Sequence, residues 1–252
     1  MTPDVVVDIG NSRIKWGLCD EGGISVVAAR PHAESPDASD ILVEFGLAGP
    51  VRWAVAGVQP VRLAAFVAWA TGRGDDVVVV DRHDRLPLTV AVDFPERVGI
   101  DRLLAAVAVN RRRTPGAPVI FADAGSAITV NFVDANGVFQ GGSIAPGLGL
   151  MSRALNAYTA KLPLVSPEPL LALNPKFPAG TTTAAILCGL RAAAVGGTRE
   201  LVSQVMATGA RPELFVTGGD GWLLADGLAD LNPRYVSSLT LEGIRLAAEA
   251  LP

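Results

Sequence analysis

The sequence predicts an α/β protein built from two similar domains, and three observations lead to this. The chain has 252 residues, enough for two domains of about 120 residues each. Half of the residues are hydrophobic and 18% are charged, which is typical of a globular protein. An opening pattern of short strands around a turn recurs about 115 residues later, a spacing that equals the expected domain size.

The first half begins with strands and continues with alternating strands and helices. Three short hydrophobic runs separated by turn residues predict a β-meander at Val5–Ile9, Ile14–Leu18 and Ile24–Ala29. The hydrophobic spacing after them predicts a helix at Ser39–Leu47, a strand at Val51–Ala56, a helix at Val61–Thr71, a strand at Val77–Val80 and a helix from Asp101. The breaker Thr114-Pro115-Gly116 ends that last helix, so we expect domains at 1–116 and 117–252.

The second half repeats this opening. Strands are predicted at Val119–Ala122, in the run after Ser126, and at Val138–Ile144. The proline-rich segment Pro163–Pro178 predicts an ordered loop or linker. The rest of the chain predicts a helix at Thr182–Ala207, a strand at Leu214–Thr217 and a helix at Leu241–Ala250. The glycines within the first of these helices favour either a kink or close contact with another helix.

The two halves align with one residue deleted. Asp8 then falls on Asp123, and the glycine two positions later in each half is also matched. The remaining matches are Ser12 with Ser126, Ile14 with Ile128, Leu18 with Phe132, Asp20 with Asp134 and Gly23 with Gly137. The alternative to a duplication is chance, because two unrelated strand–turn–strand units also resemble each other. The regular spacing favours an internal duplication.

Composition argues against several classes of partner. The net charge of −4 gives no broad positive field for nucleic acid. No apolar run approaches the roughly 18 residues that cross a bilayer, so neither export nor membrane insertion is expected. Cys19 and Cys188 lie far apart without a CxxC motif, and the two histidines, His32 and His83, stand in polar stretches typical of a surface. We therefore expect a cytoplasmic protein.

Each repeated unit carries an Asp-x-Gly sequence at a strand end, followed by a hydroxyl residue. The chain contains no GxxxxGK[ST] and no GxGxxG motif. An aspartate at a strand end can hold Mg²⁺, and a glycine lets backbone N–H groups approach a polyphosphate. A single Asp-x-Gly is usually an ordinary tight turn. The duplicated pair favours two turns that clamp one triphosphate.

Four segments in this order resemble the type III pantothenate kinases. They are DIGNSRIKW from Asp8, GIDR from Gly99, DAGSAIT from Asp123 and GGSIAPGLGLMSRALNAYTAKLP from Gly141. With the glycines at 218 and 219, the matches span most of the chain. The resemblance implies two duplicated ribonuclease-H-like domains of the actin-like ATPase and sugar kinase type. It also implies phosphorylation of pantothenate by ATP, the first step of coenzyme A biosynthesis, in a homodimer that requires Mg²⁺ and K⁺ or NH₄⁺.

The resemblance also implies a role for each matching residue. The phosphate-binding residues are Asp8, Ile9, Gly10, Asn11, Ser12, Arg13, Ile14 and Lys15 in the first segment and Ser126 in the second. Asp8 is expected near magnesium and Asp123 at the monovalent cation. Pantothenate is expected at Gly99, Ile100, Asp101, Arg102 and Thr182, with Asp101 as the base. Gly218 and Gly219 fit a turn that packs on adenosine.

Chemistry supports the assignments of Asp101 and Arg102. An alcohol that attacks the γ-phosphoryl group needs an acceptor for its proton, and a carboxylate suffices. Because Asp101 opens a helical stretch, it could also be an N-cap, and the two roles are compatible. Arg102 can bind the carboxylate of pantothenate with two hydrogen bonds, or it can be a surface arginine.

Three positions depart from the family pattern. Ser126 replaces the usual threonine, Asn131 stands where aspartate is common, and Val92 stands where tyrosine is frequent, with Phe94 two positions later. These changes bear on affinity for cation and substrate rather than on reaction type. The alternatives to a pantothenate kinase are a non-catalytic regulatory relative of the same fold and another phosphotransferase of the superfamily.

Overall fold

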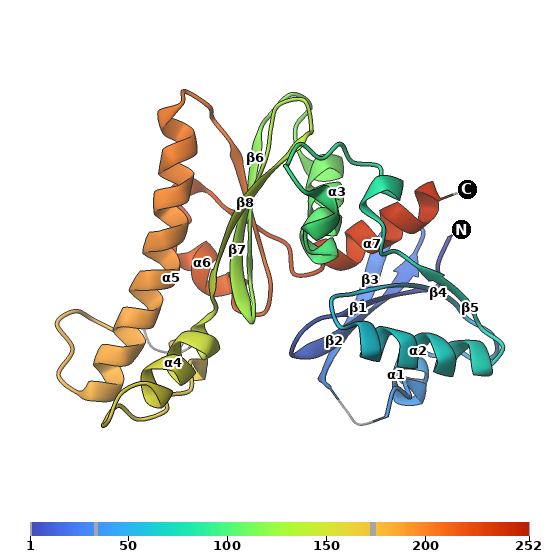
Figure 1. The fold of residues 1–252 in the computed structure, drawn as a ribbon, viewed down its shortest axis with the longest axis horizontal. Coiled ribbons are helices and arrows are strands. Elements are labelled where there is room, and N and C mark those ends of the chain that lie inside the picture. Colours follow the sequence, from blue (N-terminus) through green and yellow to red (C-terminus); the bar gives the residue numbers. More distant parts are fainter. Residues whose placement is uncertain (1, 33–34, 172–174, 252) are drawn as a thin grey trace. The chain divides into compact units, whose positions relative to one another are not determined.

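The computed structural model describes residues 2–32, 35–171 and 175–251 (Figure 1). The chain divides into two compact units. The first comprises Met1–Arg112, Gly137–Phe139 and Ser238–Pro252, and the second comprises Arg113–Asn136 and Gln140–Ser237. The boundary after Arg112 lies before the expected one at 116/117, and a short hairpin segment and the C-terminal helix both join the first unit.

The first unit contains a five-stranded sheet of order β3-β2-β1-β4-β5. Its strands are β1 (Val5–Ile9), β2 (Arg13–Asp20), β3 (Gly23–Pro31), β4 (Arg52–Gly57) and β5 (Asp76–Val79). β1 is antiparallel to β2 and parallel to β4. The β-branched residues and sharp turns of this region explain the meander, and its prediction is confirmed.

Helices cover both faces of this sheet. They are α1 (Ser39–Glu44), α2 (Pro60–Gly72), α3 (Ile100–Arg112) and α7 (Leu239–Ala250). Val5, Val7 and Ile9 belong to the core that contains residues of α1 and α2. A Cβ atom on Gly17 would lie 3.0 Å from Val6 and 3.3 Å from Leu241 of α7. Because side chains alternate along a strand, Val6 and Asp8 point to the face covered by α7.

The second unit contains a five-stranded sheet of order β10-β9-β6-β7-β8, the same arrangement as in the first unit. Its strands are β6 (Val119–Ala124), β7 (Ala127–Val133), β8 (Phe139–Pro146), β9 (Glu213–Thr217) and β10 (Arg234–Tyr235). Asp8 lies opposite Lys15 in the β1–β2 pair, and Asp123 lies opposite Thr129 in the β6–β7 pair. The second hairpin is thus one residue shorter, as the alignment with one deletion requires, and the predicted fold class is confirmed.

The helices of the second unit are α4 (Leu148–Ala157), α5 (Thr182–Ala207) and α6 (Gly221–Gly227). α5 runs unbroken through Gly189, Gly196 and Gly197. Helices α4 and α6 were not predicted from the sequence, because glycines at their starts indicate turns. Part of the predicted proline-rich loop, at 172–174, lies outside the described residues. Within the described part of the chain, no helix is both long and apolar enough to span a bilayer.

Candidate active site

Asp8 is a buried carboxylate near the end of β1. Its exposed fraction is 9%, and its neighbours Val7 and Ile9 face the opposite side of the sheet, toward α1 and α2. Lys15 is its direct partner on β2, so both side chains lie on the same face. A lysine and an aspartate side by side at a strand end can bind phosphate oxygens and a cation together.

The turn between β1 and β2 presents polar groups to solvent. Gly10 N donates a hydrogen bond to Arg13 O at 3.1 Å, which closes the turn. The side chains of Asn11, Ser12 and Arg13 are exposed. Gln59 Nε2, at the start of α2, donates to Asn11 Oδ1 at 3.0 Å. The turn therefore combines an amide, a hydroxyl and a guanidinium, which suits an anionic ligand.

His32 supports this turn, contrary to the expectation that it is only a surface residue. Its Nε2 atom lies 2.9 Å from Gly10 O, and its Nδ1 atom is buried without a partner among the described residues. Because a carbonyl oxygen can only accept, Nε2 must carry the proton. His32 follows β3, so a distant segment fixes the orientation of the Gly10 carbonyl. This role of His32 could not be predicted from the sequence, because no local pattern links it to Gly10.

Replacing His32 should weaken nucleotide binding. In His32→Ala, loss of the hydrogen bond to Gly10 O should raise the KM for the nucleotide about 2- to 10-fold, the equivalent of one ordinary hydrogen bond. His83→Ala removes the other histidine, which lies in a short 3-10 helix at His83–Arg85, and serves as the control. Equal KM values in the two variants and the parent would contradict a supporting role for His32.

Asp101 and Arg102 lie in the first turn of α3. The helix starts at Ile100, so Asp101 is inside the helix rather than at its N-cap, and the alternative of a plain cap is wrong. Asp101 Oδ1 accepts a hydrogen bond of 2.9 Å from Arg102 N. Gly99 O also accepts from Arg102 N, at 3.1 Å. The start of a helix carries a partial positive charge, which attracts anionic groups.

Arg102 is half-buried and contacts an aromatic ring. Its Cζ atom lies 5.7 Å from the centroid of Phe139. Burial lowers the pKa of the Arg102 guanidinium, whereas neighbouring Asp101 raises it. The group stays charged at neutral pH, because the ordinary pKa of an arginine side chain lies far above neutral pH. A partly desolvated guanidinium binds a carboxylate more strongly than a fully hydrated one.

In the second unit, Asp123 occupies the position of Asp8. Its Cα partners are Thr129 on β7 and Thr217 on β9, so two hydroxyl residues share its face of the sheet. Asp123 is half-buried, and Thr217 is 2% exposed. A carboxylate and two hydroxyls form a set of hard oxygen donors, which suits an alkali or magnesium cation.

Gly218 follows β9 and lies against Asp123. A Cβ atom on Gly218 would be 2.4 Å from Asp123 Oδ1 and 2.2 Å from Ala124 O, and its φ of +93° also requires glycine. Tyr235 Oη donates to Gly218 O at 3.2 Å. Burial, followed by the charges of Asp123 and Asp220, raises the pKa of Tyr235. This turn is therefore rigid and close to an acidic group.

The other predicted residues of the second unit have simpler environments. Ser126 is exposed in the β6–β7 turn, and Gly147 N donates to its carbonyl oxygen at 3.1 Å. Thr182 is exposed at the first position of α5, where Thr181 is the N-cap and accepts from Ala184 N at 3.2 Å. Asn131 is 1% exposed, and its Nδ2 donates to Thr129 Oγ1 at 3.1 Å. It supplies no charge beside Asp123.

Val92, which stands where the family often has tyrosine, and Phe94 lie before α3. Val92 is half-buried, and Phe94 is 55% exposed. The Cζ atom of Arg97 lies 4.7 Å from the Phe94 ring centroid.

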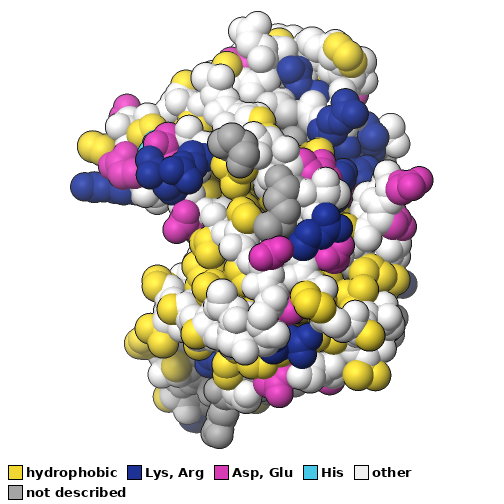
Figure 2. All heavy atoms as spheres, turned by 90° about the vertical axis from the view of Figure 1, so that its right-hand side faces the viewer, with side chains coloured by type: hydrophobic (Ala, Val, Ile, Leu, Met, Phe, Trp, Pro, Cys, Tyr) yellow, Lys and Arg dark blue, Asp and Glu magenta, His cyan; other side chains and the backbone are white. Residues whose placement is uncertain are grey.

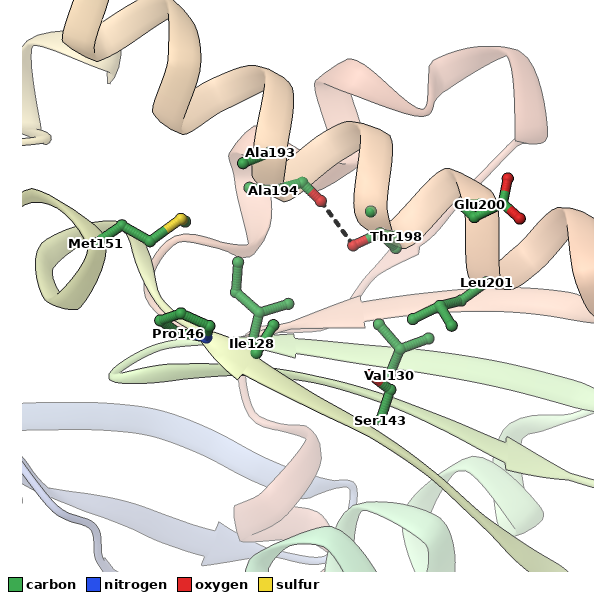
Figure 3. Close-up of a pocket in the computed structure, with 12 residues that line it drawn as sticks. Ile128, Val130, Ser143, Pro146, Met151, Ala193, Ala194, Thr198, Glu200 and Leu201 are labelled. Atoms are coloured by element: carbon green, nitrogen blue, oxygen red, sulfur yellow. Dashed lines mark hydrogen bonds between the residues drawn. The ribbon is translucent and has the colours of Figure 1, made fainter. Parts of the chain in front are cut away.

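A cavity of about 360 Å³ lies elsewhere in the second unit, between α5 and strands β7 and β8 (Figure 3). Its wall is mostly apolar, and Ile128 and Met151 point into the space below α5. Thr198 is already satisfied, because its hydroxyl donates to Ala194 O at 2.9 Å. None of the predicted site residues lines this cavity.

Basic and acidic side chains are mixed on the face drawn in Figure 2. The exposed salt bridges of the protein include Arg52 with Asp4 and Arg82 with Asp84. Such pairs add little stability, but they divide the surface charge into small patches.

Comparison with known proteins identifies a family. The model of the type III pantothenate kinase family matches residues 5–204. A type III pantothenate kinase of Paracidovorax citrulli is 31% identical over 258 residues, covering 97% of this chain and 98% of that protein. One from Rhodopirellula baltica is 42% identical over 147 residues, covering 58% of this chain and 52% of that protein.

A solved structure supports the fold. The activator of 2-hydroxyisocaproyl-CoA dehydratase from Clostridium difficile, with bound ADPNP, has a TM-score of 0.55 at 14% identity and covers 98% of this chain and 95% of that one. At this identity the likeness concerns the fold alone, which is that of the actin-like ATPases and sugar kinases. The family match extends over every candidate site residue except those of the turn at Gly218 and Gly219, and the chain therefore belongs to the type III pantothenate kinase family.

Proposed function

We propose that this protein transfers the γ-phosphoryl group of ATP to the primary hydroxyl of pantothenate, giving phosphopantothenate and ADP. The observation that carries this proposal is the family match over residues 5–204, which includes every acidic residue that the chemistry needs. Asp8, Asp101 and Asp123 are all present. A non-catalytic relative could lack any of them.

The acceptor is bound and activated at the start of α3. Arg102 binds the carboxylate of pantothenate with two parallel hydrogen bonds, and Gly99, Ile100 and the exposed Thr182 add contacts. As the hydroxyl oxygen forms its bond to the γ-phosphorus, the bond to the bridging oxygen of ADP breaks. The hydroxyl proton passes to the Asp101 carboxylate. The hydrogen bond from Arg102 N to Asp101 Oδ1 restricts the rotation of that carboxylate.

The phosphates are bound by the two Asp-x-Gly turns. In the first, Gly10, Asn11, Ser12 and Arg13 supply donors, and Lys15 supplies a point charge, while Ile9 and Ile14 fix the strand ends. In the second, Ser126 supplies a hydroxyl. The adenosine packs on the turn at Gly218 and Gly219.

Two cations are part of the proposal. Magnesium in kinases is held by one or two carboxylates and the phosphates, and the buried carboxylate of Asp8 beside Lys15 fits that need. Asp123, with Thr129 and Thr217 on the same face, fits K⁺ or NH₄⁺. When bound, such cations neutralise the charge that develops on the phosphoryl oxygens.

We further propose a cytoplasmic homodimer. The family resemblance is the reason for the dimer. The two cysteines are both free, as a reducing compartment requires. Burial raises the pKa of the Cys19 thiol to about 12, so it stays protonated at neutral pH.

A coupled assay of ADP release tests the proposed reaction. ADP should appear with pantothenate and not with glucose or without an acceptor, and the rate should rise when potassium is added. Release with glucose would indicate a sugar kinase, and release without an acceptor would indicate an ATPase. No release under any condition, with nucleotide binding intact, would indicate a regulatory relative.

A further inference from the structure

The segment Gly137–Phe139 connects β7 to β8 but is anchored in the first unit. Gly137 O accepts a hydrogen bond of 2.7 Å from Asn110 Nδ2, near the end of α3. Phe139 N donates to Thr89 O, and Phe139 O accepts from Ala91 N, both at 2.9 Å. Both the N–H and the C=O group of Phe139 are therefore held by the segment that precedes α3.

The side chain of Phe139 is fully buried and faces Arg102. Its exposed fraction is 0%, and the Arg102 Cζ atom lies 5.7 Å from its ring centroid, within the range of a cation–π contact. Arginine has many rotamers in solution. A fixed aromatic face beside the guanidinium removes some of them, and contact with a ring does not use the N–H groups at the edge of a guanidinium.

We propose that Phe139 is a positioning residue that orients the Arg102 guanidinium for the carboxylate of the acceptor. This inference rests on the proposed function, since it needs Arg102 to bind that carboxylate. A purely structural phenylalanine would require only a buried apolar side chain of similar size, and leucine comes close to that. A positioning role requires the negative face of the aromatic ring.

The test compares two acceptors in two variants. Phe139→Leu should raise the KM for pantothenate roughly 2- to 30-fold, the span of a cation–π contact, while kcat and the KM for ATP stay close to the parent values. With pantothenyl alcohol, which has a hydroxyl in place of the carboxylate, parent and variant should have the same KM. Phe66→Leu, at another buried phenylalanine of the first unit, is the matched control and should change neither KM.

If Phe139→Leu does not fold, a trifluorinated phenylalanine at position 139 provides a second test. It nearly keeps the ring shape but weakens the negative ring face, so the KM for pantothenate should rise here too. Equal effects on both acceptors, or no effect of fluorination, would overturn the positioning role. Failure of the proposed function is a separate result, because the parent protein itself would then show no pantothenate-dependent ADP release.

Discussion

Asp101→Asn should lower kcat by about 10²- to 10⁴-fold, the usual contribution of a general base, while the affinity for ATP stays close to that of the parent. Asparagine has nearly the same shape as aspartate, and its amide oxygen can still accept the hydrogen bond from Arg102 N. It cannot take the hydroxyl proton of the acceptor. Steady-state kinetics with pantothenate, together with ATP binding measured by calorimetry, checks both parts.

The matched control is Asp40→Asn. Asp40 is the second residue of α1, as Asp101 is the second residue of α3, so both changes remove a negative charge from the first turn of a helix. Each should cost at most about 1 kcal/mol of stability through the helix dipole. Only Asp101→Asn should reduce turnover. Undiminished turnover in that variant would remove the base assignment.

Gly243→Ala should destabilise the protein by about 1–3 kcal/mol and also reduce its activity. A Cβ atom at Gly243 would lie 1.9 Å from Leu104 O, a backbone atom of α3. Helices α3 and α7 would therefore have to move apart. Leu104 is only one turn from Asp101 and Arg102, so the displacement should reach the residues that bind and activate the acceptor. Thermal unfolding and the ADP-release assay measure the two effects.

Gly196→Ala is the same substitution at another helix, and here we expect a gain in stability rather than a loss. Gly196 lies within α5, and a Cβ atom there would meet nothing within 4 Å. Alanine should therefore stabilise the helix by up to about 1 kcal/mol, through its higher helix propensity. If Gly243→Ala unfolds at the same temperature as the parent or Gly196→Ala, close packing of α7 on α3 is not important for stability.

The sequence was most informative where the signal is local. The hydrophobic runs around Asp8 and Asp123 predicted both hairpins, and their one-residue difference agrees with the observed strand registers. α6 was missed because the glycines before it resemble a turn. The hydrogen bond of His32 to Gly10 and the contact of Phe139 with Arg102 join residues far apart in the chain. No periodicity in a single sequence encodes such contacts, because they depend on how the elements fold together.

Membership of the C-terminal helix in the first unit has a consequence for how the protein can be divided. The polypeptide passes from one unit to the other at four points, after Arg112, Asn136, Phe139 and Ser237. A fragment ending at residue 116 would lack α7, and the apolar surface of α3 around Leu104 would face water. The two halves of this duplication are therefore no longer interchangeable. An engineered exchange of the first half would have to include helix α7, although α7 lies at the other end of the chain.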